Sequence, residues 1–412
     1  MRANAANVDP MLEELEQEIA KYIGTKYAIV CSSARTAIRF SLLALDIGHG
    51  DEVVIPDFAC QILPITVFCT GASPRFCDVT RQTCALSSTS LEEMLRPNTK
   101  AVIFVQLFGL PVDPSPIQEI VKKRGITLID DAAQALGVSI GGKKAGSFGK
   151  VGILTFNKFL RVGLGGAATT DDEELAHKIK HIRNKHERKS RLASLGYYMM
   201  DFFGLKSEKI MRAVFFADNH LNQLVNITLA EKHFQETNGW VKANPNVLES
   251  WRSNTLTPEM IDQLMTYAGR YWHQRNLEKT EISALKDDLE NLEEYLQDRR
   301  RTAKMYDEHL KRGSFERIHI PPNSTPSYMR YPVLFSDRTK LSRCIEQLTQ
   351  AGFTVDYRYK PLHRSPFFGP FNDGIEFSES VYVWEHVLPL PIAVKMDSKM
   401  IQKVASIVND NS

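Results

Sequence analysis

Between residues 11 and 180, short apolar runs alternate with amphipathic stretches, and this alternation constrains the fold more than any other feature of the chain. The runs 53–55 and 101–105 are continuously apolar, 126–129 is apolar apart from Thr127, and a helical pattern over 116–124 separates the last two. Continuous apolar strands that alternate with helices are typical of a parallel sheet covered on both faces. Because ligands of such sheets bind beyond the carboxyl ends of the strands, we expect the functional residues just after these runs.

Composition narrows the class of protein. Of the 412 residues, 43% are hydrophobic and 24% are charged, which excludes a disordered chain. The 51 Lys and Arg residues nearly balance the 49 Asp and Glu residues, so nucleic acid is not expected as a partner. The N-terminus lacks the apolar core of a secretory signal, and no apolar run is long enough to span a membrane. The six cysteines form no metal-ligand or disulfide pattern, so we predict a cytoplasmic enzyme without a metal site.

Three regions follow one another along the chain. We predict a large domain over 1–184, a helical insertion over 185–275 and a long helix with a small C-terminal α+β domain over 276–412. In the insertion, basic residues precede the aromatic segment 195–216. That order is compatible with an amphipathic helix on a membrane surface, or with a helix that packs on its own domain or on a partner subunit.

The C-terminal region has its own pattern. A charged helix is expected over 285–310, and its Arg299-Arg-Arg301 triplet is interpreted as a solvated helix face. A strand over 331–335, a helix over 341–351 and a strand over 353–355 are expected to complete the small domain.

An acidic pair follows one of the apolar runs. Asp130 and Asp131 stand directly after the strand predicted over 126–129. Side chains alternate along a strand, so only one of the two carboxylates can point at a given ligand. A carboxylate at this place is suited to pair with a cationic heterocycle, although a capping or solvated pair would have the same sequence.

A lysine and a glycine-rich turn come next. Lys158 follows the apolar run 153–156 and precedes Gly163-Leu-Gly-Gly166. A lysine amine held against apolar surroundings loses its proton readily, as Schiff-base chemistry requires. The glycines would let the backbone approach a planar ligand. By itself, this pattern is also compatible with an exposed loop lysine.

Small polar residues form a third candidate, Cys31-Ser-Ser-Ala-Arg-Thr-Ala37, between a predicted strand and a predicted helix. Backbone N–H groups at a helix N-terminus, with hydroxyls beside them, would hold a phosphate; a plain N-cap by Ser32 or Ser33 is the alternative.

The three candidate motifs together are more specific than any one of them. Pyridoxal phosphate needs an amine for its aldehyde, an anion for its ring nitrogen and a helix dipole for its phosphate.

At these residues the chain resembles the DegT/DnrJ/EryC1/StrS sugar aminotransferase family of fold type I pyridoxal phosphate enzymes. The resemblance covers roughly residues 11–184 and 276–405. It implies an α/β large domain, with a mixed, mostly parallel sheet between helices, and a smaller C-terminal α+β domain. The segments that carry it are Asp130-Asp131-Ala-Ala-Gln134-Ala-Leu-Gly137, Thr155-Phe156 with Lys158 and Gly165-Gly166, Gln106-Leu-Phe-Gly109, Pro361-Leu-His363 and Leu390-Pro-Ile392.

The resemblance also implies a role for each site residue. Lys158 would form a Schiff base with pyridoxal 5′-phosphate and then shuttle the proton. Asp131 would pair with the pyridinium nitrogen, and Gln134 would contact the ring hydroxyl. The residues expected around the phosphate are Ser33, Ala34, Arg35 and Thr155.

Other positions concern the partner subunit and the substrate. Asn276 would reach the phosphate of the neighbouring subunit, which implies a homodimer with shared active sites, and His363 is expected near the substrate.

The chain departs from the family pattern in three places. Arg35 replaces a threonine, Cys60 stands where an aromatic residue often stacks on the ring, and Glu278 replaces an arginine.

The implied reaction moves an amino group from an amino acid, expected to be glutamate, to a keto sugar that is expected to be nucleotide-linked, in amino-sugar and polysaccharide biosynthesis. Lys158 argues against the family's dehydratases, in which histidine replaces the lysine. Two alternatives stay open. One is an aminotransferase for a cyclitol or another ketone, and the other is a non-enzymatic or membrane-associated scaffold that contacts the inner membrane face through 195–216.

Overall fold

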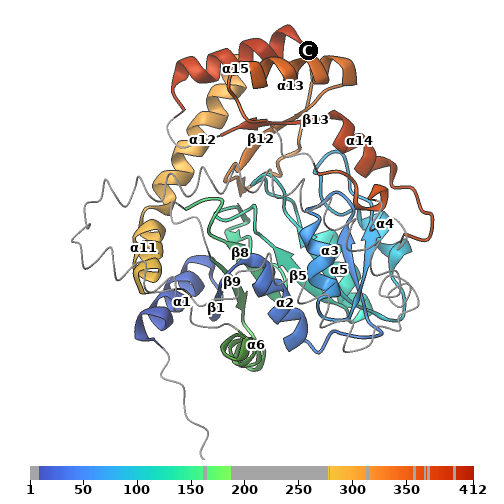
Figure 1. Ribbon diagram of the computed structural model, residues 1–412, viewed down its shortest axis with the longest axis vertical. Coiled ribbons are helices and arrows are strands. Elements are labelled where there is room, and N and C mark those ends of the chain that lie inside the picture. Colours follow the sequence, from blue (N-terminus) through green and yellow to red (C-terminus); the bar gives the residue numbers. More distant parts are fainter. Residues whose placement is uncertain are drawn as a thin grey trace, which may run out of the picture.

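The computed structural model of the chain describes residues 9–160, 165–186, 277, 279–311, 315–355, 359–365, 368, 372–392 and 396–412. A large α/β body is formed mainly by the N-terminal half of the chain, and a smaller layer of C-terminal elements lies above it (Figure 1). The predicted insertion lies outside the described residues from position 187 onward, as do the segment 195–216 and Asn276.

The elements of the large body follow in chain order. Its helices are α1 (Pro10–Ile23), α2 (Ala34–Ala44), α3 (Ile62–Phe68), α4 (Ser88–Met94), α5 (Ser115–Arg124) and α6 (Glu173–His186). Its strands are β1 (Tyr27–Cys31), β2 (Glu52–Pro56), β3 (Ser73–Cys77), β4 (Thr99–Val105), β5 (Thr127–Asp131), β6 (Ser139–Ile140), β7 (Lys143–Lys144), β8 (Val151–Thr155) and β9 (Gly166–Thr170).

The C-terminal elements begin with two consecutive helices. The helices are α11 (Lys279–Glu290), α12 (Leu292–His309), α13 (Arg338–Gln350), the 3₁₀ turn η1 (Leu362–Arg364), α14 (Ser378–His386) and α15 (Ser398–Asp410). The strands are β10 (Glu316–Arg317), β11 (Ser324–Thr325), β12 (Arg330–Leu334) and β13 (Val387–Pro391).

In the part of the chain that the structure describes, the large sheet has the strand order β1-β9-β8-β5-β4-β2-β3. The strands from β8 to β3 run parallel, whereas β9 is antiparallel to both β8 and β1. β1 therefore runs in the same direction as β8 and β5, and all three carboxyl ends lie at one edge. The predicted α/β fold with a mixed, mostly parallel sheet is confirmed.

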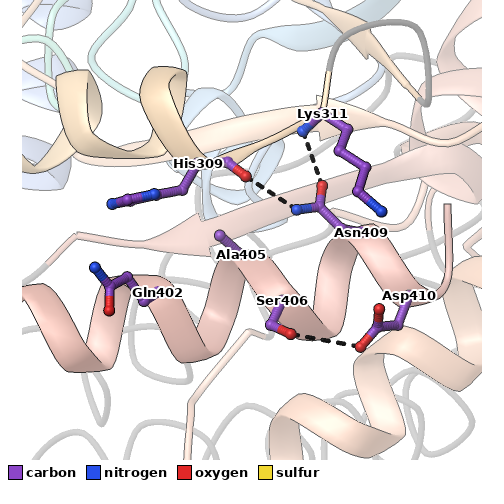
Figure 2. Close-up of a pocket in the computed structure, with 7 residues that line it drawn as sticks. All are labelled: His309, Lys311, Gln402, Ala405, Ser406, Asn409 and Asp410. Carbon is purple, nitrogen blue, oxygen red and sulfur yellow. Dashed lines mark hydrogen bonds between the residues drawn. The ribbon is translucent and has the colours of Figure 1, made fainter.

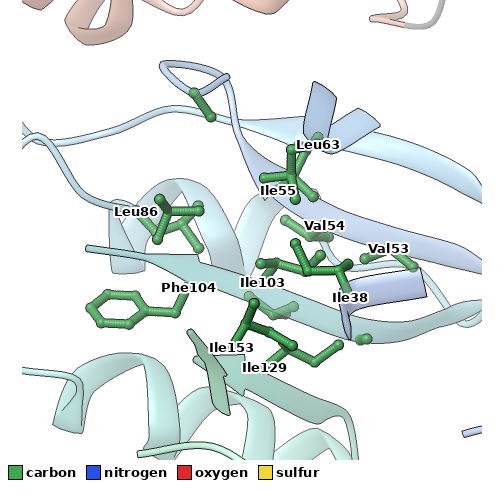
Figure 3. Close-up of a cluster of buried hydrophobic side chains, with 14 of the residues drawn as sticks. Ile38, Val53, Val54, Ile55, Leu63, Leu86, Ile103, Phe104, Ile129 and Ile153 are labelled. Atoms are coloured by element: carbon green, nitrogen blue, oxygen red, sulfur yellow. The ribbon is translucent and has the colours of Figure 1, made fainter. Parts of the chain in front are cut away.

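Alternating side chains divide between the two faces of this sheet. In β1, Ile29 and Cys31 belong to one buried cluster, whereas Ala28 and Val30 belong to another. The first cluster joins the sheet to α2 and α6, and Figure 3 shows its centre, where apolar side chains of β2, β4, β5 and β8 meet. The second cluster joins the sheet to α1, α11 and the start of α12. Helices thus cover both faces, as the continuous apolar strands predict.

A buried ion pair connects the first strand to helices on opposite faces. The side chain of Arg183 in α6 is only 2% exposed, and it pairs with Glu16 in α1. Arg183 Nη1 also donates to the carbonyl oxygen of Val30 at 3.1 Å, and the amide of Val30 donates to Glu16 Oε1 at 3.0 Å. Three elements that converge near the end of β1 are therefore held by one connected set of polar groups.

The small domain is built around a three-stranded antiparallel sheet in the order β10-β12-β13. Helices α13 and α15 lie above this sheet, on the side away from the large sheet (Figure 1). Two expectations were wrong here. The segment 353–355 forms no strand, and β13 fills the sheet instead. The single helix expected over 285–310 is two helices that meet at Asn291.

The interpretation of Arg299-Arg-Arg301 as a solvated face was wrong for its first member. The side chain of Arg301 is 70% exposed, and it pairs with Asp298 one turn earlier on the same helix. Arg299 is buried and only 7% exposed. A triplet covers most of a helical turn, so its members cannot all face solvent when one side of the helix packs against the protein.

The segment between α13 and β13 packs against the large domain, and β13 and α15 then complete the small domain. Leu362, Phe377 and Val383 belong to the same buried cluster as the strands of the large sheet. Asp78, just after β3, accepts hydrogen bonds from the amides of Glu379 and Ser380 in the first turn of α14. This carboxylate satisfies N–H groups that a helix start leaves without internal partners.

We predict that Arg183→Met destabilises the fold by about 3 kcal/mol, because it removes the buried cation that pairs with the Glu16 carboxylate and leaves only the more exposed Lys180, at 3.7 Å, as its partner. Urea unfolding followed by circular dichroism measures the change. The double variant with Glu16→Gln should recover part of the loss, since no unpaired charge then remains. Lys178→Met, which removes an exposed pair with Glu174, is the control and should leave the midpoint unchanged. Equal midpoints for both single variants would contradict this account.

Candidate active site

The predicted site residues gather where neighbouring strands of the large sheet end. β5 ends at Asp131 and β8 ends at Thr155, three residues before Lys158. The register pairs Thr155 with Gly166 and Gly166 with Cys31, so the end of β1 and the start of α2 lie beside them. In the sequence the end of β1 lies about a hundred residues or more before Asp131 and Thr155, and the sheet brings them to one edge.

Lys158 and Asp131 form the centre of this group. Burial lowers the pKa of the Lys158 amine, Arg35 lowers it further, and the nearby Cys60 and Asp131 oppose the shift. Asp131 is 7% exposed, and burial raises its pKa, against a hydrogen bond from the Ala133 amide at 3.0 Å and the charge of Lys158. The amine and the carboxylate thus interact at a place where each is partly removed from water.

The two adjacent aspartates point to different surroundings, as strand alternation requires. Asp130 is fully buried, and its Oδ2 accepts from the amides of Gly146 at 2.6 Å and Phe148 at 3.1 Å. Its Oδ1 accepts from Gln106 Nε2 at 2.8 Å. Burial raises the pKa of Asp130 to about 6, against these three hydrogen bonds. Asp130 therefore fixes the loop before β8, and Asp131 faces Lys158.

The start of α2 provides a cradle of backbone and hydroxyl groups. Ser33 is the N-cap of the helix, and its Oγ accepts from the amide of Thr36 at 3.2 Å. The Oγ atoms of Ser32 and Ser33 each lie 3.0 Å from the Thr36 hydroxyl. The N-cap expected of Ser32 or Ser33 is thus made by Ser33, and the role of these serines in holding a phosphate stays a prediction. The following residues are Ala34 and Arg35, at the positions predicted to hold a phosphate.

Gly166 brings the backbone of β9 close to this cradle. A Cβ atom at this position would lie 2.5 Å from the amide nitrogen of Ala34 and 2.6 Å from the carbonyl oxygen of Leu154. Only glycine permits that approach. Thr155, opposite in the register, donates from its hydroxyl to Asn157 Oδ1 at 2.8 Å. The glycine-rich turn noted in the sequence thus ends at a position that closes on the N-terminus of α2.

Gln134 and Cys60 lie on further loops of this edge. Gln134 Oε1 accepts from the amide of Phe108 at 3.1 Å, and its Nε2 donates to the Tyr359 hydroxyl at 2.7 Å. Tyr359 is a contact that the sequence did not single out, because it comes from the distant small-domain segment. Cys60 follows β2, is exposed, and lies close enough to Arg35 to affect its pKa, which burial lowers and Cys60 opposes.

His363 is held by carboxylates on both sides of its ring. Nδ1 lies 2.8 Å from Oδ2 of the buried Asp57, and Nε2 lies 3.2 Å from Glu376 Oε2. Burial alone would lower the pKa of His363, but the two carboxylates outweigh it and the pKa is raised. The amide of His363 also donates to Asp57 Oδ1 at 2.8 Å. These contacts attach the small-domain segment to the end of β2, and the predicted role of His363 at the substrate stays a prediction.

A surface notch between the end of α12 and α15 is not part of this site. Figure 2 shows that Asn409 bridges its rim: Nδ2 donates to the carbonyl oxygen of His309 at 2.9 Å, and Oδ1 accepts from the amide of Lys311 at 2.9 Å. These bonds satisfy backbone groups where α12 ends. The residues of the notch therefore serve to join two helices of the small domain.

The described residues fit the predicted pyridoxal phosphate. The close approach of Gly166 leaves the backbone of the cradle free of a Cβ atom, and α2 presents its N-terminus there. Asp131 is a buried carboxylate at a strand end, and its charge interacts with the amine that would bind the aldehyde. Asn276, predicted for the partner's phosphate, lies outside the described residues.

Comparisons with known proteins identify related chains. The model of the DegT/DnrJ/EryC1/StrS aminotransferase family matches residues 1–208 and 261–409. A GDP-perosamine synthase of Caulobacter vibrioides is 36% identical over 182 residues, which are 44% of this chain and 49% of that protein. A UDP-N-acetyl-3-dehydro-alpha-D-glucosamine 3-aminotransferase of Acidithiobacillus ferrooxidans is 38% identical over 173 residues, which are 41% of this chain and 47% of that protein. The matched part spans about half the length of these relatives.

Solved structures share the whole fold. The aminotransferase TlmJ of Streptoalloteichus hindustanus superposes with a TM-score of 0.72 at 21% identity, over 98% of this chain and 91% of that chain. A DegT DnrJ EryC1 StrS aminotransferase of Brucella abortus gives 0.70 at 21% identity, over 98% and 90%. At this level of identity the likeness concerns the fold.

The hydrogen bonds that Asp130 accepts allow a prediction that separates the effect of its negative charge from the effect of its hydrogen-bonding oxygen atoms. Asp130→Ala should cost about 2–4 kcal/mol, because two buried backbone amides lose their acceptor. Asp130→Asn should retain or increase stability at pH 7.5, since its oxygen can accept from both amides. Its Nδ2 can donate to Gln106 Oε1, a buried atom without a hydrogen-bond partner among the described residues, once that amide turns over.

The difference in stability between the wild type and Asp130→Asn should depend on pH in a defined direction. The folded-state pKa of about 6 lies above the unfolded value, so the native state binds the proton more tightly between about pH 4 and pH 6. The stability of the wild type relative to Asp130→Asn should therefore fall by up to about 3 kcal/mol as the pH rises from 4 to 7.5. Urea unfolding of both proteins across this range measures it. A stability difference that is constant with pH contradicts the assignment.

Proposed function

Because the chain belongs to the DegT/DnrJ/EryC1/StrS aminotransferase family, we propose that it is a pyridoxal 5′-phosphate-dependent aminotransferase that transfers an amino group from an amino acid to a keto sugar. The observation that carries this proposal is the proximity of Lys158 and Asp131, close enough for each charge to affect the other's pKa, at the sheet edge where Gly166 closes on the start of α2. The cofactor, when bound, supplies an aldehyde that accepts the amino group and a ring that spreads the negative charge of the reacting carbon.

Lys158 has the properties of both a covalent anchor and a proton carrier. Burial lowers the pKa of its amine, so a larger fraction is neutral and able to bond to an aldehyde. Once an amino acid has displaced Lys158 from the aldehyde carbon, its Nζ atom remains within the site. It can then take a proton from the amino acid's Cα and deliver it to the former aldehyde carbon.

Asp131 would hold the ring nitrogen of the cofactor in its protonated form. Its carboxylate accepts only the Ala133 hydrogen bond among the contacts described for it, so it retains capacity for another donor. The buried surroundings strengthen the attraction between this anion and a protonated ring. Gln134, next on the same loop, is held by Phe108 and Tyr359 and would orient the ring from its hydroxyl side.

The phosphate would be held by the start of α2. Ser33, the backbone of Ala34 and Arg35, and Thr155 provide hydroxyls, N–H groups and one guanidinium. Arg35 would replace the hydroxyl of the family's threonine by a charge-assisted contact. Cys60 would pack against the ring in place of an aromatic side chain.

The substrate class follows from the relatives and is proposed for this chain. The two curated relatives named above carry names of enzymes that make amino sugars linked to GDP or UDP. A nucleotide-linked keto sugar is accordingly the proposed acceptor, and glutamate the proposed donor, in amino-sugar and polysaccharide biosynthesis. The intact Lys158 and Asp131 disfavour the scaffold alternative, and a cyclitol acceptor is the nearest competing substrate.

The cellular setting is also part of the proposal. No helix among the described residues is long and apolar enough to cross a membrane. We propose a cytoplasmic homodimer, and the peripheral membrane contact through 195–216 stays a prediction because that segment lies outside the described residues. Flotation of the full chain with liposomes, with and without that segment, tests the contact.

We predict that Asp131→Asn lowers kcat for amino transfer by about 10²–10⁴, because an amide cannot hold the charge of a protonated ring. Steady-state kinetics with glutamate and a panel of nucleotide-linked keto sugars measures it. The matched control is Asp130→Asn, one residue earlier, which should keep kcat within about threefold since Asp130 faces the Gly146 loop. If the two variants lose activity equally, the assignment of Asp131 is wrong.

The shared-site proposal predicts complementation. Lys158→Ala and Asn276→Ala should each be inactive as homodimers. After the chains exchange, half of the dimers are mixed and one of their two sites has both residues, so about a quarter of wild-type activity should return. Mass spectrometry of the intact dimers verifies the exchange. Complete exchange without recovered activity contradicts the sharing of sites.

A further inference from the structure

Arg299 is a buried cation in contact with the loop that carries Lys158. It lies on α12, and its Nη2 donates to the backbone carbonyl oxygen of Lys158 at 3.2 Å. Its guanidinium carbon also lies 5.2 Å from the ring centre of Phe159. Phe159 is 4% exposed, so the guanidinium and the ring are packed together away from water.

The same guanidinium reaches a second segment. Arg299 Nη1 donates to the carbonyl oxygen of Tyr328 at 3.2 Å, just before β12. The amide of Tyr328 donates to the carbonyl oxygen of Gly109 at 3.1 Å, and the neighbouring Phe108 amide donates to Gln134. A continuous series of bonds therefore runs from the backbone of Lys158, through Arg299, to the loop that holds Gln134.

This placement is costly for a charged group. Burial and, to a smaller extent, the charge of Arg330 together lower the pKa of Arg299 to about 10, so the side chain is still a cation at neutral pH. The contacts recorded for it are two carbonyl oxygens and a ring, with no carboxylate among the described residues, and its Nε has no hydrogen-bond partner there. A helix face that served only solubility would not bury such a group.

We propose that Arg299 is a positioning residue for Lys158: its two donors fix the carbonyl of Lys158 against the entry to β12 and thereby set where the amine stands relative to Asp131. The proposal rests on the proposed role of Lys158. A planar guanidinium spans two carbonyl oxygens at a fixed separation, which a single ammonium cannot do. Loss of either contact frees the loop 156–160 to turn, and displacement of a reacting amine by about 1 Å costs up to about 10²-fold in rate.

The test measures the reactivity of the Lys158 amine in the cofactor-free full chain. Trace acetylation with acetic anhydride, followed by peptide mass mapping, gives the ratio of label on Lys158 to label on the exposed Lys178 of the same molecule. The variants are Arg299→Met, which keeps the stem over Phe159 but has no donors, and Arg299→Lys, which has one point charge. Arg301→Met, two positions along the same helix and exposed, is the matched control.

We expect the labelling ratio to change by roughly fivefold or more in Arg299→Met, less in Arg299→Lys, and within about 1.5-fold of wild type in Arg301→Met. In the loaded protein, kcat should fall by about 10–100-fold in Arg299→Met with KM for the donor within about threefold. A wild-type ratio in Arg299→Met overturns the proposal. If that variant does not fold, a wild-type ratio and kcat in Arg299→Lys overturn it instead.

The two proposals fail separately. If the wild-type chain takes up no pyridoxal phosphate, the proposed function is wrong, and the acetylation ratio still reports whether Arg299 controls the amine. If the cofactor binds and amino transfer proceeds, but Arg299→Met keeps the wild-type ratio and kcat, only the inference about Arg299 is wrong.

Discussion

The interaction between the Lys158 amine and the Asp131 carboxylate is the constraint on which the rest of the site depends. Each group is partly removed from water, and each opposes the pKa shift that burial causes in the other. Such a pair is expensive unless the surrounding fold holds it in place. The parallel arrangement of β5 and β8 does so, because it ends both strands at one edge and leaves their following residues side by side.

Other features of the fold serve this edge. Asp130 fixes the loop before β8 through two backbone amides, and Gly166 lets β9 approach the start of α2. Segments that follow β12 in the sequence also contribute. Tyr359 contacts Gln134, and His363 attaches its segment to Asp57 at the end of β2. The site is therefore assembled from both domains, although its central residues all belong to the large one.

Much of this could be predicted from the sequence, because the decisive patterns are local. Continuous apolar runs identified the central strands, and strand alternation required Asp130 and Asp131 to face different surroundings. Contacts between distant segments left no such signal. The burial of Arg299 and the bond between Tyr359 and Gln134 depend on how α12 and the small domain pack on the large sheet. The segment 353–355 has the composition of a strand, but β13 occupies the place beside β12.

The most direct test of the central claim is reduction of the protein, loaded with pyridoxal phosphate, by borohydride and identification of the labelled peptide by mass spectrometry. Reduction fixes the cofactor to whichever lysine carries it. We predict one label per chain, on Lys158, and none when the wild type is first exposed to excess amino donor that displaces the lysine. A label on another lysine, or no label on a protein that retains the cofactor, would contradict the account.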